Sequence, residues 1–363
     1  MLASYGLLDR MLHRLALGSR VVARASFDFE RAMTSRLERD AHLAGRLSEC
    51  ASQAVYITGL ARSGTTLLLR ILAATGEFRA QTYRDMPFVL APRLWQRLRG
   101  ADGRDIEPAE RAHGDGVVVD ADSPEAFEEV FWKTFCSYSK DDRSLSAEPP
   151  SETVLESFAT FRRTVCSSTA VQPLRYLSKN NNNVLRIRHL AAQSRAIVLV
   201  PYREPRECAA SMYRQHLRFS EIQRRQPFAR EYMSLLMHHE FGLDCRALFP
   251  AVRYMTSGLS PDHPDYWLDY WSAMHAFLLE QPRVPFVFLA YDDLRKQPTA
   301  VLPALYSCLG IEKSVESGAA QVRGVPLVYG SAPEFSPSML LRANTVHASV
   351  RADPRNLSFS AKS

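Results

Sequence analysis

The sequence predicts a three-layer α/β/α fold with a central parallel β-sheet and helical insertions. Within residues 54–74, a short β-branched and aromatic run leads into a loop rich in Gly, Ser and Thr, and an apolar helical segment follows. A short strand candidate occurs at 175–178, and apolar runs typical of buried strands occur at 196–202 and 285–291, with helical patterns between them. Strands that alternate with helices form parallel sheets, because each right-handed crossover returns the chain to the same end of the sheet.

Length and composition are those of a folded globular protein. The 363 residues are 46 % hydrophobic and 23 % charged, which suffices for one large α/β domain or for two domains. We expect residues 1–50 to form helices that pack on the core, and residues 51–312 to form the α/β domain. Residues 313–363, in which Gly, Pro and Ser are frequent, are expected to form an irregular extension.

Charge and cysteine usage narrow the expected partners and compartment. The formal charge is +6, and only six of the 45 basic residues are lysines. Arginine suits phosphate and sulfate, whereas the absence of a long basic run or an RNA-binding signature argues against nucleic acid. The six cysteines form no Cys-x-x-Cys pair, and we find no secretory signal and no apolar run that could span a bilayer. We therefore expect a cytoplasmic protein, and a homodimer is left open.

The glycine-rich loop after the first strand departs from a triphosphate-binding loop in one informative place. Gly59 and Gly64 have the spacing of the Walker A glycines, and Thr66 stands where the metal-binding hydroxyl would be. Thr65 replaces the lysine, and Arg62 lies inside the loop instead. Backbone N–H groups and a helix N-terminus still favour an anion here. Without the lysine, the loop suits a terminal group on a 5′-phosphate better than a γ-phosphate.

The loop residues Arg62, Ser63, Gly64, Thr65 and Thr66 resemble the 5′-phosphosulfate loop of a known family. This family comprises the sulfotransferases that use 3′-phosphoadenosine 5′-phosphosulfate (PAPS) as the donor. The resemblance is to the bacterial and tyrosylprotein-type branch of these P-loop-like enzymes. It implies that all five residues bind the donor and that Arg62 also stabilises charge during transfer.

A second motif follows the strand at 196–202. Arg203 lies at the strand end, Pro205 opens a helix, and Ser211 lies in the second turn of that helix. An arginine and a serine so placed can both face one anion near the helix N-terminus. The pattern resembles the family's 3′-phosphate site, and the resemblance implies that Arg203 and Ser211 bind that phosphate.

Lys179 follows the strand segment at 175–178 and precedes four asparagines, Asn180 to Asn183. It resembles the family's lysine after the second strand, which contacts the sulfuryl group and stabilises negative charge on the leaving phosphate. Relatives usually have a small residue or proline next, so the asparagine run is a departure. The resemblance implies a catalytic role for Lys179.

A general base must take the acceptor's proton, and the sequence leaves three candidates open. Asp85 lies near the place where tyrosylprotein sulfotransferases carry a catalytic glutamate, although Thr82 occupies the nearest equivalent position. His113, in a polar segment, is the second candidate. Glu128 and Glu129 are the third, and their alternative interpretation is a solvated helix face.

Three further expectations concern neighbouring residues. Ser123 and Pro124 predict the start of a helix that runs to Phe135. Arg84, beside Asp85, is expected to bind the donor or an acidic acceptor. The run from His238 to Glu240 looks like part of a metal site, but no second ligand pair at helical spacing accompanies it, so no metal is expected.

These motifs together predict a nucleotide-binding enzyme of sulfation, in which the sulfuryl group passes in line from PAPS to a hydroxyl or amine acceptor. Such transfer depends mainly on positioning and charge stabilisation. The acceptor stays open between carbohydrate, lipid, small metabolite and peptide tyrosine. Two alternatives remain, a P-loop-type nucleotide kinase or NTPase and a non-catalytic nucleotide-binding protein with the same fold.

Overall fold

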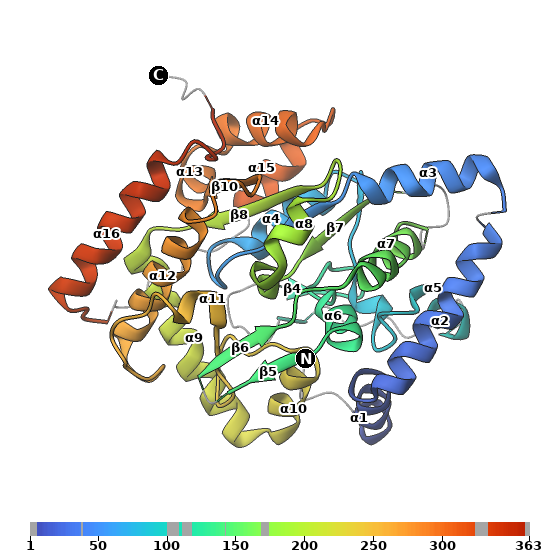
Figure 1. The fold of residues 1–363 in the computed structure, drawn as a ribbon, viewed down its shortest axis with the longest axis horizontal. Helices are drawn as coiled ribbons and strands as arrows, with labels where there is room; N and C mark the ends of the chain where they lie inside the picture. Colours follow the sequence, from blue (N-terminus) through green and yellow to red (C-terminus); the bar gives the residue numbers. More distant parts are fainter. Residues whose placement is uncertain are drawn as a thin grey trace.

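A computed structural model describes residues 6–37, 39–99, 109–110, 118–141, 143–167, 174–323 and 333–359. Its centre is a five-stranded parallel sheet with the order β10–β8–β1–β7–β2, and helices cover both faces (Figure 1). The strands are β1 (Val55–Ile57), β2 (Phe78–Arg79), β7 (Arg175–Lys179), β8 (Ile197–Tyr202) and β10 (Phe286–Ala290). The predicted α/β/α fold with a central parallel sheet is confirmed.

Strand β1 is apolar throughout because both of its faces are buried. Val55 and Ile57 pack in a cluster with α4 (Thr65–Ala73) and α14 (Pro298–Leu309). Tyr56 points to the opposite cluster, which contains side chains of α7 (Glu152–Cys166), α9 (Pro205–Arg225) and α12 (Pro264–Leu279). Continuous apolar strands of this kind are typical of parallel sheets that lie between two helical layers.

The chain order reverses at β1, and this positions the functional residues. From β1 the chain passes through α4 to β2 and β7 on one side, whereas β8 lies on the other side. Ile57 pairs with Lys179 of β7 and with Leu199 of β8. Ligands of open α/β sheets bind where strand order reverses, beyond the carboxyl ends of the strands. The glycine-rich loop and Arg203 follow strands at this edge, and Lys179 is the last residue of β7.

The N-terminal segment is helical and packs on the core. Its helices are α1 (Leu7–His13), η2 (Arg14–Gly18), α2 (Arg20–Leu37) and α3 (Ala41–Ser52), of which α2 and α3 contact α7. In α1 and η2 the buried side chains are those of His13, Ala16 and Leu17. Four large apolar residues of these two elements are exposed: Leu7, Leu8, Met11 and Leu15. Among the described residues, no helix has both the length and the apolar character needed to cross a bilayer.

Short elements complete the molecule. A small sheet combines β5 (Tyr138–Lys140), β6 (Ser144–Ala147) and β9 (Ala247–Leu248), and β3 (Ala109–Glu110) pairs with β4 (Val118–Val119). The remaining helices are η3 (Tyr83–Asp85), α5 (Pro92–Arg99), α6 (Glu129–Phe135), η4 (Asn181–Arg186), α8 (Ile187–Ala191), α10 (Pro227–Leu235), α11 (Phe249–Val252), α13 (Tyr291–Lys296), α15 (Glu316–Arg323) and α16 (Pro337–Ala352).

The C-terminal segment is more regular than the sequence predicted. Helix α16 lies beside α12 along one side of the molecule (Figure 1). Arg342 of α16 pairs with the buried Asp269 of α12. The chain then meets the sheet, because the N–H of Phe288 donates to the carbonyl oxygen of Arg355 at 2.9 Å. The expectation of an irregular extension is therefore wrong for residues 337–357, which tertiary contacts hold in place.

The helix predicted from Ser123 begins six residues later. Pro124 instead forms an antiparallel bridge with Thr82, and the N–H of Glu125 donates to the carbonyl oxygen of Gln81 at 3.0 Å. These contacts with residues 81–82 keep residues 124–125 extended, so α6 starts only at Glu129. Tertiary pairing thus outweighs the local Ser-Pro start signal.

Candidate active site

The glycine-rich loop forms a compact anion cradle at the N-terminus of α4. Gly59, Arg62 and Gly64 all have positive φ angles, of 128°, 69° and 98°. A Cβ atom on Gly64 would lie 2.3 Å from Cδ2 of Tyr291, so only glycine fits this close approach. Ser63 Oγ donates to the carbonyl oxygen of Leu60 at 2.7 Å and fixes the turn. The loop thus directs backbone N–H groups and a helix N-terminus at one point.

The structure brings the two predicted phosphate motifs together, although Arg62 and Ser211 are 149 positions apart in the sequence. Arg62 Nε donates to Ser211 Oγ at 3.1 Å. Arg203 lies two residues before the start of α9, and its guanidinium lies 5.3 Å from the ring centre of Tyr291. One of its terminal nitrogens donates to Glu207 at 3.2 Å, while its buried Nε has no hydrogen-bond partner among the described residues. A buried donor without a partner fits a site that awaits an anionic ligand.

Arg214 is a third arginine at this site, and the sequence analysis missed it. Burial lowers the pKa of its guanidinium; Glu207 raises that pKa, and the positive charges of Arg203 and Arg62 lower it. The arginines are therefore close enough to repel each other, with Glu207 as a neighbouring carboxylate. A signal was available, because Arg214 follows Ser211 by three residues and so lies on the same face of α9.

Lys179 is the last residue of β7, which pairs with β1. The four asparagines after it have structural roles, because they bond neighbouring segments. The N–H of Asn180 donates to the carbonyl oxygen of Ile57 at 2.9 Å and continues the pairing with β1. Each asparagine side chain then donates to a different partner. These pairs are Asn180 to Glu129 at 2.6 Å, Asn181 to Glu240 at 3.0 Å, Asn182 to the carbonyl of Met237 at 3.1 Å, and Asn183 to Glu128 at 2.8 Å.

Glu128 and Glu129 lie in the interior, so their interpretation as a solvated helix face is wrong. Their exposed fractions are 2 % and 1 %. Glu129 forms a buried ion pair with Arg186 at 2.9 Å. Glu128 accepts hydrogen bonds from Trp132 at 2.8 Å and Tyr176 at 2.9 Å, besides the one from Asn183. These contacts occupy both carboxylates, so the geometry supports a structural role rather than that of a base.

Asp85 has a similar structural environment. It is fully buried and accepts two hydrogen bonds from Arg79, at 2.8 and 2.9 Å, and one from the N–H of Thr82 at 2.8 Å. These contacts close the turn of η3 and do not favour Asp85 as the base. Arg84 pairs with Asp122 at 2.8 Å on the surface, away from the role expected for it. His113 lies outside the described residues.

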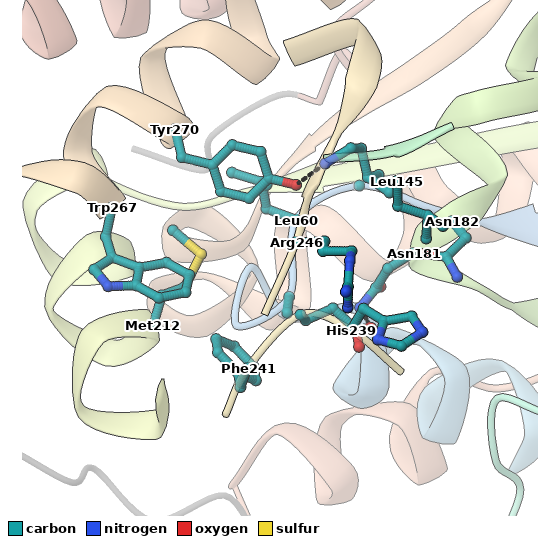
Figure 2. A pocket seen from close by; sticks show the side chains of 14 residues that line it. Leu60, Leu145, Asn181, Asn182, Met212, His239, Phe241, Arg246, Trp267 and Tyr270 are labelled. Atoms are coloured by element: carbon teal, nitrogen blue, oxygen red, sulfur yellow. Dashed lines mark hydrogen bonds between the residues drawn. The ribbon is translucent and has the colours of Figure 1, made fainter. Parts of the chain in front are cut away.

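A carboxylate that the sequence analysis considered only as a metal ligand lies beside the loop. Glu240 lines a pocket whose wall includes Gly59, Leu60 and Ala61. Figure 2 shows Trp267, Met212 and Phe241 on one side of this pocket, with Asn181, His239 and Arg246 on the other. The pocket combines an apolar wall with a polar one next to the anion cradle. Among the described residues, no three His, Cys, Asp or Glu side chains gather as metal ligands.

Charges around Glu240 favour its ionised form. Burial raises the pKa of this carboxyl, but the charges of His238 and Lys179 and the hydrogen bond from Asn181 lower it below its usual value. Lys179 is therefore near enough to influence Glu240, although no predicted motif connects the two residues. The structure thus places a base-type carboxylate and the loop at one pocket, and the charge of the strand-end lysine acts on that carboxylate.

Comparisons with known proteins identify the family of the chain. The chain is similar to the crystal structure of a sulfotransferase from Mycobacterium avium, at 15 % identity and a TM-score of 0.46, over 83 % of this chain and 76 % of that one. For a sulfotransferase from Mycobacterium tuberculosis the values are 16 %, 0.44, 88 % and 82 %. No curated protein matches the sequence. The family model described as the sulfotransferase domain matches residues 52–323, which is more than half of the chain. The chain therefore belongs to the sulfotransferase family.

Proposed function

We propose that this protein transfers the sulfuryl group of PAPS to a hydroxyl or amine acceptor. The observation that carries the proposal is the hydrogen bond from Arg62 to Ser211. It joins the phosphosulfate loop to the second anion motif, so a single ligand with phosphates at two positions can contact both. A simple triphosphate offers no second phosphate for the arginines at the start of α9.

The residues divide the work of binding and transfer. The loop from Arg62 to Thr66 holds the 5′-phosphosulfate through backbone N–H groups and hydroxyls. Arg203, Arg214 and Ser211 hold the 3′-phosphate, and the unpartnered Nε of Arg203 fits this role. Lys179 and Arg62 stabilise negative charge on the leaving phosphate, as fixed cations do in transfer through loose transition states. A cytoplasmic location and a possible homodimer stay sequence-based predictions.

Ligand-dependent thermal shifts test the donor assignment. We expect 3′-phosphoadenosine 5′-phosphate (PAP) to raise the melting temperature in the absence of Mg²⁺, because a ligand that binds only the folded state stabilises it. ADP or GTP with Mg²⁺ should have little effect. The reverse pattern would favour the nucleotide kinase or NTPase alternative. Binding of PAP without any sulfuryl transfer would favour a non-catalytic protein.

The 3′-phosphate site is tested by Arg203→Ala. A hydrogen bond to a charged group contributes roughly 1.5–3 kcal/mol, so PAP affinity should fall by about one to two orders of magnitude. Arg206→Ala is the matched control, because Arg206 is an exposed arginine in the first turn of the same helix. Calorimetric titration with PAP measures both variants. Equal affinities of Arg203→Ala and wild type would refute the assignment.

A further inference from the structure

Glu240 is joined to the phosphosulfate loop through one residue, Asn181. Thr58, which immediately precedes the loop, donates its hydroxyl to the carbonyl oxygen of Asn181 at 3.2 Å. The side-chain nitrogen of Asn181 donates to Oε1 of Glu240 at 3.0 Å. The carboxylate is therefore held in a fixed position relative to the strand end from which the loop begins.

Asn181 also leaves an acceptor atom for a ligand. The residue is 6 % exposed, and its Oδ1 atom has no hydrogen-bond partner among the described residues. Asn181 and Glu240 both line the pocket beside Gly59 and Leu60. A ligand hydroxyl at this point could donate to the carboxylate or to the amide oxygen. A buried acceptor without a donor fits such a ligand.

We propose that Glu240 is the general base of the reaction and that Asn181 positions it, an inference that rests on the proposed sulfuryl transfer. The acceptor oxygen forms a bond to sulfur, and the bond between sulfur and the bridging oxygen of the 5′-phosphate breaks. The electron pair of that bond stays on the phosphate oxygen. The acceptor's proton passes to the carboxylate of Glu240, so charge and atoms balance.

The surroundings keep Glu240 ionised and ready to accept a proton. Electrostatic interactions with His238, in the same segment, and with Lys179, at the end of β7, lower the pKa of the carboxyl, as does the hydrogen bond from Asn181. The same Lys179 would stabilise the leaving phosphate, so one cation serves both ends of the transfer. The other titratable groups that face Glu240 or share its pocket are Cys245, Tyr270, His239 and Arg246.

Glu240→Gln tests the proposal, because glutamine keeps the shape of the side chain but cannot take the proton. The assay follows PAP release from PAPS with water, methyl glucoside or 4-nitrophenol as the acceptor. We expect PAP affinity to equal that of wild type. Turnover with water or methyl glucoside should fall roughly 10²–10⁴-fold, the usual contribution of a general base. The loss with 4-nitrophenol should be far smaller, because this phenol ionises without help at mildly alkaline pH.

The outcomes separate this proposal from the proposed function. Wild-type protein that fails to bind PAP would refute the donor assignment itself. Normal PAP binding with equal turnover of wild type and Glu240→Gln on all three acceptors would overturn the role of Glu240 alone. An equal loss on the acidic and the weakly acidic acceptors would also overturn it. Asp244→Asn is the matched control, because Asp244 lies in the same segment and pairs with Arg230 outside the pocket.

Discussion

The asparagine run bonds glutamates in two regions of the molecule, and the two regions differ in how many hydrogen bonds the carboxylate accepts. In the inner cluster, Glu129 accepts hydrogen bonds from Asn180 and Arg186, and both glutamates of the 128–129 pair are almost completely buried. At the pocket, Glu240 accepts one side-chain hydrogen bond among the described residues, from Asn181. Adjacent asparagines therefore support one saturated carboxylate and one that still borders a pocket.

The difference teaches how to separate structural from reactive carboxylates. A carboxylate whose oxygens are all occupied by fixed donors has no position left for a substrate proton. A carboxylate at a pocket, held by one amide and flanked by cations, keeps such a position and stays ionised. Both carboxylates are glutamates that accept a hydrogen bond from an asparagine of the same run, so the distinction appears only in the three-dimensional contacts.

The largest expected effect on stability comes from breaking the inner cluster. Glu129→Gln leaves the buried guanidinium of Arg186 without its counter-charge, and removal of one partner of a buried ion pair costs about 3–5 kcal/mol. Urea denaturation should show this loss in the free energy of unfolding. Glu240→Gln should cost less than about 1 kcal/mol in the same assay, because glutamine still accepts the bond from Asn181.

An exposed glutamate provides the control for this comparison. Glu156 lies on the exposed face of α7, and Glu156→Gln should change the free energy of unfolding by less than about 0.5 kcal/mol. If Glu129→Gln behaved like Glu156→Gln, the inner cluster would not be the structural element that its contacts indicate. The contrast with Glu240 would then lose its basis.

Local patterns were enough to predict the sheet and the loop. The strand–loop–helix unit, the strands β7, β8 and β10, and the positions of Arg62, Lys179, Arg203 and Ser211 follow from contiguous residues. Strand β2 was missed because two residues give no periodicity to detect. Helix α16 was missed although Ser336 and Pro337 form a helix-start signal, because its stability comes from contacts with α12 and the sheet edge.

The chemistry of the carboxylates could not be predicted because their partners are distant in sequence. The residues that bond Glu128 and Glu129 include Asn183 and Arg186, which are 55 and 57 positions away. Glu240 meets Asn181 across 59 positions. No spacing rule connects such pairs. In the sequence, the asparagine run is only a departure from the family pattern. In the structure, its side chains donate hydrogen bonds to Glu128, Glu129 and Glu240.

The next largest effect should come from removing the charge of Lys179, which lowers the pKa of Glu240. Lys179→Met removes the charge but keeps the stem of the side chain, so PAP binding should largely survive. Turnover of PAPS should fall roughly 10²–10³-fold, the usual cost of losing one preorganised group that stabilises transition-state charge. Single-turnover kinetics with saturating PAPS measures this effect. Unchanged turnover would show that Lys179 acts on neither end of the transfer.

The smallest and sharpest effect is a shift in pH dependence. His238 lowers the pKa of Glu240, so the neutral variant His238→Gln should raise that pKa. The carboxylate then takes up a proton at higher pH, and the acid limb of kcat/KM should move to higher pH relative to wild type. The rate well above this limb should change by less than about tenfold, because the base itself remains. A limb that moved to lower pH, or that vanished with the rate, would make His238 the proton acceptor and Glu240 its partner.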